Sequence, residues 1–248
     1  MTAAAPVALI IAPHLDDAAL SVSNRLQRGG VLVATVFAGV PRAEAPLGAW
    51  DRLTGATSSR ERQLERLAED DAAMQLAGAR AVRLDELDEQ YRDGRAVDIG
   101  MLASRMSALI DGVSEVWLPA GIGHDDHLAA REAGIAAARR AGHRDVVLYA
   151  DFPHVVPYGW PAWVTGNPAE PYLNVDAWFC DEMRRHGLDP EHLSPEVVRL
   201  GTEGAEFKRR LIGSYPSQLP ALFLDAGHLE RDPSLLGFEV LWHLDLRA

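Results

Sequence analysis

The stretch "IIAPHLDDAALS", Ile10–Ser21, decides the fold and marks the first candidate site. A continuous apolar run, Val7–Ala12, is typical of a strand that is buried on both faces of a parallel sheet. The residues that follow predict a short helix that ends at Gly29 and Gly30. One histidine and two aspartates therefore lie where a buried strand is succeeded by a helix.

The first 151 residues continue this alternation of strands and helices. Further strands are predicted at residues 31–39, 80–84, 115–121 and 145–151, with helices at 58–78, 98–111 and 127–142. Such alternation predicts an α/β, Rossmann-like fold with a mostly parallel sheet, right-handed crossovers and helices on both faces. We expect the strand order 3-2-1-4-5.

The regular alternation of strands and helices ends after Asp151. Residues 152–170 are rich in proline and aromatic residues, helices are predicted at 175–187 and 195–214, and a late edge strand is predicted at 237–246. We expect a single domain over 1–248, with a core at 1–151 and a loop- and helix-rich C-terminal elaboration at 152–248. The long loops at 40–59 and 152–170 are candidates for the walls of a binding site.

The composition excludes several classes of protein. The chain has 248 residues, of which 48% are hydrophobic, so it can bury a large core. The formal net charge of −12 argues against nucleic acid or an anionic membrane as the main partner. The single cysteine, Cys180, cannot form an internal disulfide. Because no basic signal-peptide start and no membrane-length apolar segment is found, we expect a cytoplasmic protein.

A second cluster of the same residue types follows the fourth predicted strand. The stretch "GIGHDDHLAA" places His124, Asp125, Asp126 and His127 directly after "EVWLPA". In the order 3-2-1-4-5 the first and fourth strands are neighbours, and the crevice between their carboxyl ends is where such sheets bind ligands. The two clusters are therefore expected to face each other.

Histidine nitrogens and aspartate oxygens together suit zinc or a similar divalent ion. His14 and Asp17 can converge on one ion, a third ligand can come from the second cluster, and Asp16 is then left over as a base. An aspartate at a helix start can instead be a simple N-cap, so Asp16 or Asp17 could have that role. Two clusters at equivalent strand ends favour the metal site.

At these residues the sequence resembles the LmbE-like, or PIG-L, family of zinc-dependent N-deacetylases. The family pattern is an apolar strand followed by "(A/P)HPDDE" and later by "HPDH"; here the two motifs read "PHLDDA" and "HDDH". Two further segments, "RLAEDDAAMQLAG" and "FKRRLIGSYPSQL", are also similar to the family. Leu15 and Asp125 replace the two prolines, and Ala18 replaces the terminal glutamate of the first motif.

The resemblance implies a metal centre with three protein ligands, His14, Asp17 and His127. The metal would be Zn²⁺, or another divalent ion such as Fe²⁺. Since the family's terminal glutamate is not itself a metal ligand, the change to Ala18 leaves this ligand set intact.

The resemblance also implies roles in proton transfer and substrate binding. Asp16 matches the general base, and His124 matches the histidine, expected to be protonated, that acts at the carbonyl oxygen or the leaving amine. Asp126 matches a carboxylate that orients His124. Arg66 and, less directly, Asp93 match substrate contacts.

The function that follows is N-deacetylation of a small-molecule N-acetyl amino sugar or sugar conjugate, such as a bacterial secondary-metabolite or thiol-glycoside intermediate. No nucleic acid or membrane partner is expected. One alternative is a noncatalytic sugar- or metal-binding relative. The other is a Rossmann-like nucleotide-binding protein, which would need a glycine-rich phosphate loop where this chain has the acidic "PHLDDA".

Overall fold

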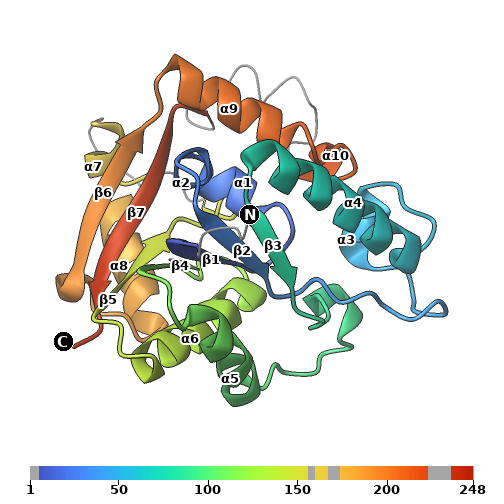
Figure 1. Cartoon of the computed structure of the whole chain (residues 1–248), viewed down its shortest axis with the longest axis horizontal. Coiled ribbons are helices and arrows are strands. Elements are labelled where there is room, and N and C mark those ends of the chain that lie inside the picture. The colour runs from blue at the N-terminus through green and yellow to red at the C-terminus, as the bar shows by residue number, and fades with distance from the viewer. Residues whose placement is uncertain (1–5, 156–159, 167–173, 223–235, 248) are drawn as a thin grey trace, which may run out of the picture.

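The computed structural model describes residues 6–155, 160–166, 174–222 and 236–247. A seven-stranded sheet with the order β3-β2-β1-β4-β5-β7-β6 forms its centre (Figure 1). The five parallel strands are β1 (Ala8–Ala12), β2 (Val31–Thr35), β3 (Arg80–Arg83), β4 (Glu115–Pro119) and β5 (Asp145–Tyr149). The predicted order 3-2-1-4-5 is confirmed for these strands, and β1 lies between β2 and β4.

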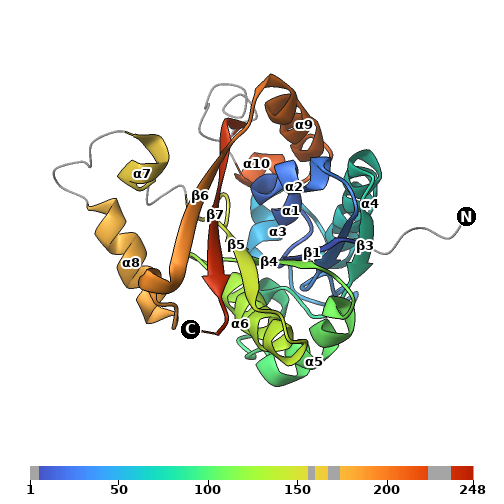
Figure 2. The ribbon, with the colours of Figure 1, turned by 60° about the vertical axis from the view of Figure 1, so that its left-hand side comes forward.

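Helices cover both faces of the sheet (Figures 1 and 2). On one face, Leu9 and Ile11 of β1 pack in a core with α5 (Ile99–Ile110) and α6 (Asp125–Arg140). On the other face, Ala8, Ile10 and Ala12 belong to a second core with α1 (Asp17–Ser21), α2 (Ser23–Gln27), α4 (Ser59–Ala77) and α9 (Thr202–Ile212). Because successive side chains of a strand point to opposite faces, the continuous apolar run of β1 serves both cores.

The first predicted helix is two short helices in the structure. The chain leaves helical geometry at Val22, where φ is −139° and ψ is 38°, so α1 ends at Ser21 and α2 begins at Ser23. Val22 is buried in the second core, and this break turns α2 relative to α1 without exposing the apolar side chains.

The C-terminal part differs from the prediction in two ways. Residues 195–199, the expected start of a helix, belong to the strand β6 (Leu193–Arg199), and only α9 is helical within the predicted range 195–214. The strand β7 (Phe238–Asp245) is present as predicted, but it lies between β5 and β6 and is not at the edge. Both pairings of β7 are antiparallel, and Pro195 is tolerated in β6 because an edge strand needs fewer ladder donors.

Short helices complete the described chain: α3 (Ala49–Leu53), η1 (Glu89–Tyr91), α7 (Ala162–Thr165), α8 (Val175–Arg185), η3 (Pro190–His192) and α10 (Leu219–Leu222). Of the predicted loop wall at 152–170, residues 156–159 and 167–170 lie outside the described residues. None of the described helices has the length and apolar character needed to cross a membrane. The division into core and elaboration stays a prediction.

Candidate metal centre

The loop between β1 and α1 folds His14 and Asp17 toward each other. The backbone N–H of His14 donates to Asp17 Oδ2 over 2.7 Å, and His14 Nδ1 lies 3.3 Å from the same oxygen. Asp17 is the first residue of α1, and it follows β1 by a turn of only four residues. The short turn therefore fixes both side chains at the carboxyl end of the central strand.

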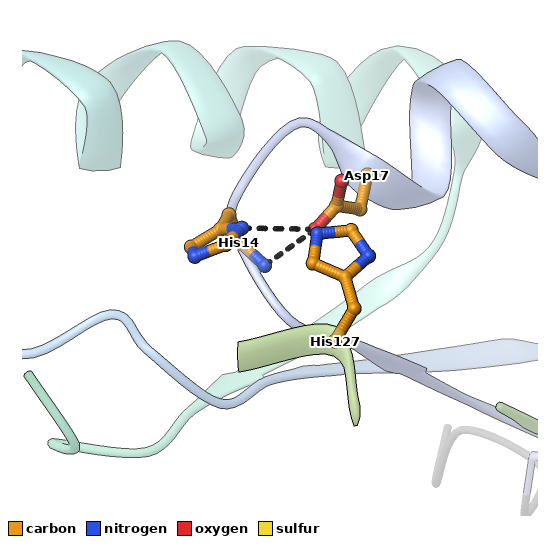
Figure 3. A group of neighbouring side chains, drawn as sticks. All are labelled: His14, Asp17 and His127. Atoms are coloured by element: carbon orange, nitrogen blue, oxygen red, sulfur yellow. Dashed lines mark hydrogen bonds and ion pairs between the residues drawn. The ribbon is translucent and has the colours of Figure 1, made fainter. Parts of the chain in front are cut away.

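His127 completes a set of three donors. It lies in the first turn of α6, is fully buried, and places Nε2 3.3 Å from Asp17 Oδ2 (Figure 3). One donor atom from each of His14, Asp17 and His127 lies within 4.8 Å of the other two. His127 Nε2 is buried and has no hydrogen-bond partner. A buried, unsatisfied ring nitrogen facing a carboxylate and a second imidazole fits a tetrahedral metal ion with one position free.

A buried aspartate holds the far side of the His127 ring. His127 Nδ1 lies 2.7 Å from Asp151 Oδ1, and Asp151 Oδ2 accepts the backbone N–H of Ile122 over 2.7 Å. A carboxylate on Nδ1 keeps the proton there and leaves the Nε2 lone pair for a metal. Asp151 was not among the predicted site residues. The available signal was its position just after the fifth parallel strand, at the same sheet edge as the two clusters.

Asp126 has the corresponding place beside His14. Its Oδ2 lies 3.1 Å from His14 Nε2 and accepts the backbone N–H of Glu89 over 3.0 Å, while Arg92 lies 2.6 Å from Oδ1. The structure thus pairs the Asp126 carboxylate with His14, whereas the resemblance implied that it orients His124. A second donor set of His14, His124 and Asp126 also exists, and within it His14 Nε2 already lies 3.1 Å from Asp126 Oδ2.

His124 is oriented by the backbone instead. It caps α6, and its Nδ1 accepts the backbone N–H of Asp126 over 3.1 Å, so the neutral ring carries its proton on Nε2. Burial, together with the nearby His14 and His127, lowers the pKa of His124 to about 4. The expected protonated state is therefore not favoured, and a bound cation would disfavour it further.

Asp16 stands at the N-cap position of α1, but its side chain makes no capping hydrogen bond. The simple capping alternative is therefore wrong for Asp16. Burial and the charge of Asp17 raise the pKa of Asp16, while Arg66 opposes this shift. Asp16 is thus a buried carboxylate with a higher proton affinity than usual.

The cluster opens into one cavity of about 410 Å³, which we call the catalytic pocket. Its walls include predicted residues from both motifs, Arg66, and side chains from the loop at 40–59: His14, Asp16, Asp17, Leu20, Ala49, Trp50, Leu53, Arg66, Asp88, Glu89, Gln90, His124, Pro153, His154 and Leu222. His154 packs against the rings of His124 and His127 at centroid distances of 5.0 and 4.7 Å. Asp93 lines a neighbouring cavity and not this one.

Trp50 is fixed at the wall of the catalytic pocket by a chain of hydrogen bonds. Its Nε1–H donates to Gln218 Oε1 over 2.7 Å, and Gln218 Nε2 donates to Ser217 Oγ over 2.7 Å. Ser217 in turn donates through its hydroxyl and its backbone N–H to Glu69. Since Gln218, Ser217 and Glu69 are buried, the indole is held in one orientation.

Comparison with known proteins gives structural matches only. No family model matches the chain, and a search of curated proteins finds no match. Among solved structures, the A40926 pseudoaglycone deacetylase Dbv21 is 27% identical, with a TM-score of 0.67, over 99% of this chain and 100% of that one. A deacetylase of teicoplanin biosynthesis, solved as a teicoplanin complex, is 25% identical, with a TM-score of 0.69, over 96% and 98%.

The resemblance to the LmbE-like deacetylases is confirmed. The N,N′-diacetylchitobiose deacetylase from Pyrococcus horikoshii, at 15% identity and a TM-score of 0.50 over 94% of this chain and 82% of that one, shares the fold alone. Because one fold can support several reactions, the activity of this chain depends on the residues of its own site.

Proposed function

We propose that this protein is a metal-dependent N-deacetylase that hydrolyses the acetamide of an N-acetyl amino sugar or sugar conjugate. The observation that carries the proposal is the buried Nε2 of His127, which has no hydrogen-bond partner among the described residues and faces Asp17 and His14, two residues of one cavity wall. Asp16 and His124 line the same cavity, so a proton acceptor and a hydrogen-bond donor lie beside the metal ligands.

His14, Asp17 and His127 would hold the ion, with zinc best suited to this mixed set and Fe²⁺ as the alternative. When bound, such an ion lowers the pKa of a coordinated water and polarises an amide carbonyl. Asp126 and Asp151 each hold the outer nitrogen of one metal histidine, through Nε2 of His14 and Nδ1 of His127. The two carboxylates therefore fix the tautomer and orientation of both rings.

Asp16 would act as the general base. It accepts one proton from the attacking water while the oxygen of that water bonds to the amide carbon. Its raised pKa strengthens it as a base, and the absence of a capping bond leaves its carboxylate available. Arg66, also buried, opposes this rise and favours the ionised carboxylate that can accept a proton.

His124 would stabilise the amide oxygen as it gains negative charge. The backbone N–H of Asp126 occupies Nδ1, so the neutral ring presents Nε2–H as a donor. When the C–N bond breaks, the electron pair stays on nitrogen, and the proton held by Asp16 passes to that nitrogen. The products are a free amine and acetic acid, which together account for the amide and one water; the acid then loses its proton to solvent and leaves as acetate.

The substrate class rests on the two similar solved structures and on the pocket. The proteins most like this chain among those described above are named as deacetylases of A40926 pseudoaglycone and of teicoplanin biosynthesis. The fixed indole of Trp50 offers an apolar surface, which suits the apolar face of a sugar ring. A conjugate of an N-acetyl amino sugar fits both observations.

Two measurements test the proposal. Metal analysis of the purified protein should find about one divalent ion per chain. Incubation with a panel of N-acetylated sugars and glycoconjugates should then release acetate and a primary amine in equal amounts. A protein that holds the metal but releases no acetate from any member would favour the noncatalytic alternative. A protein without metal affinity would overturn the proposal.

A further inference from the structure

A second cavity of about 790 Å³ lies next to the catalytic pocket and has no part in the proposed chemistry. Three arginines, Arg42, Arg52 and Arg95, line it together with apolar and polar residues of two loops: Pro41, Glu44, Ala45, Pro46, Leu47, Gly48, Ala49, Leu87, Gln90, Tyr91 and Asp93. We call it the arginine cavity. Three arginines on one cavity stand out in a chain whose formal net charge is −12.

The arginines of this cavity make no ion pair with the described part of the chain, and they outnumber its two lining carboxylates. Among the described residues, none of Arg42, Arg52 and Arg95 forms an ion pair, and neither do the lining carboxylates of Glu44 and Asp93. Arg52 and Arg95 donate only to backbone carbonyl oxygens, those of Leu47 and Arg92. By contrast, Arg92 and Arg66, which are close to the catalytic pocket, are each paired with a carboxylate.

Two residues, Gln90 and Ala49, line both cavities. Gln90 Oε1 accepts the backbone N–H of Trp50 over 3.2 Å, while Gln90 Nε2 donates to Asp88 over 3.2 Å. Gly48 lies against the Gln90 side chain, since a Cβ at position 48 would be 2.1 Å from Gln90 Oε1. Because the two cavities share these wall residues, a ligand whose amide is in the catalytic pocket can extend past Gln90 and Ala49 toward the arginines.

We propose that the arginine cavity binds an anionic group, a carboxylate or a phosphate, on the part of the substrate remote from the acetamide. This inference rests on the proposed function, because it extends the same substrate beyond the catalytic pocket. Guanidinium groups form paired, charge-assisted hydrogen bonds with carboxylate and phosphate oxygens. The nearby Asp93 carboxylate and the Tyr91 wall suit the hydroxyl groups of the same substrate, in line with the sequence prediction for Asp93.

The test compares neutral and anionic substrates with the metal-loaded wild-type protein. Initial rates are measured for methyl N-acetylglucosaminide, N-acetylmuramic acid and N-acetylglucosamine 1-phosphate, and binding of each compound is measured by calorimetry. We expect at least one anionic compound to bind roughly tenfold more tightly than the neutral one, with a weaker preference at high salt. The carboxylate and the phosphate arms identify which anion is preferred.

Arg42→Gln and Arg95→Gln should reduce this preference to near unity and leave kcat for the neutral sugar unchanged. Arg80→Gln is the matched control, because Arg80 is exposed at the start of β3, the end of the strand away from the site. Equal binding of neutral and anionic compounds, or an unchanged preference in both variants, would overturn the inference. If the anion preference is absent but the neutral sugar is hydrolysed, only the inference about the arginine cavity is wrong. If anions bind through the arginines but no compound is hydrolysed, only the proposed function is wrong.

Discussion

The catalytic pocket and the arginine cavity share the wall residues Gln90 and Ala49, but their charged side chains lie in different environments. At and behind the wall of the catalytic pocket, Asp17, Asp126 and His127 are buried, and each lies within 3.3 Å of an ionisable partner. In the arginine cavity, Arg42 and Arg95 are exposed and make no ion pair among the described residues.

This difference predicts how each region responds to substitution. Removing a buried, paired charge leaves its partner unsatisfied in a low-dielectric site, so both the metal and the chemistry are affected. Removing a solvated charge costs mainly the contact that it makes with a ligand. The predictions below test this contrast and run from the largest expected effect to the smallest.

His127→Ala should abolish both metal binding and hydrolysis, because it removes one of three ligands and leaves the Asp151 carboxylate buried without its partner. Metal content should fall from about one ion per chain to near zero. Treatment of the wild-type protein with a chelator should give the same loss, reversed by added zinc. His186→Ala, at a partly exposed site after α8, is the control; full activity in His127→Ala would contradict the ligand assignment.

Asp16→Asn should lower kcat by about 10²–10⁴ and leave the metal content near the wild-type value. The reason is that Asp16 lines the pocket but belongs to neither donor set. Metal analysis and initial rates on the same preparation separate the two effects. Asp16 would lose its role as the base if the metal disappeared together with the activity.

Asp151→Asn and Asp126→Asn should each weaken metal binding about 10–100-fold without abolishing it. Each asparagine keeps the size of the carboxylate but no longer holds the ring proton of His127 or His14 with a charge. Competition with a coloured chelator measures the affinity. A lower kcat for Asp126→Asn with unchanged metal affinity would instead support the role in orienting His124 that the resemblance implied for Asp126.

Trp50→Phe should raise KM several-fold and change kcat little, since it removes the Nε1–H bond to Gln218 at the wall of the pocket. The loss of one hydrogen bond of about 1 kcal/mol sets the scale. Trp163→Phe is the control, because Trp163 lines a different cavity near α8. A large fall in kcat would indicate that Trp50 helps to place the reacting amide.

Gly48→Ala should have the smallest effect on catalysis and the clearest effect on the boundary between the cavities. The added methyl group must displace the end of the Gln90 side chain, which is flexible enough to move with little loss of stability. We expect the binding of a long anionic substrate to change while the rate with a small neutral sugar stays near normal. Equal changes for both substrates would show that Gln90 supports the pocket and does not merely divide it.

Much of the parallel half could be predicted from the sequence. The apolar run before His14 and the glycines after each helix identify the strands and helices, and the position of β1 between β2 and β4 brings the two motifs together. The metal triplet follows from this topology with the family resemblance. Asp151 could not be found in the same way, because a single aspartate after a strand carries no motif and its role depends on the orientation of His127.

The C-terminal part was less predictable because its strands depend on distant partners. The sequence of β6, "LSPEVVR", has no clear alternation, and it forms a strand because β7 pairs with it along its whole length. The role of Asp126 also depended on tertiary contacts, since Arg92 and the backbone of Glu89 turn its carboxylate toward His14. Neither contact is visible in the spacing of the "HDDH" motif.

The position of β7 also has a consequence for the order of folding. Because β7 is the later of the two strands in the chain and lies between β5 and β6, β6 has no strand partner in the described sheet until β7 is in place. During synthesis, the five parallel strands can pair before β7 has been made. The strands β6 and β7 then join the sheet together in one late step. In a ribosome-bound chain stalled before residue 238, we therefore expect the two metal motifs to resist protease while the β6 segment is still cleaved.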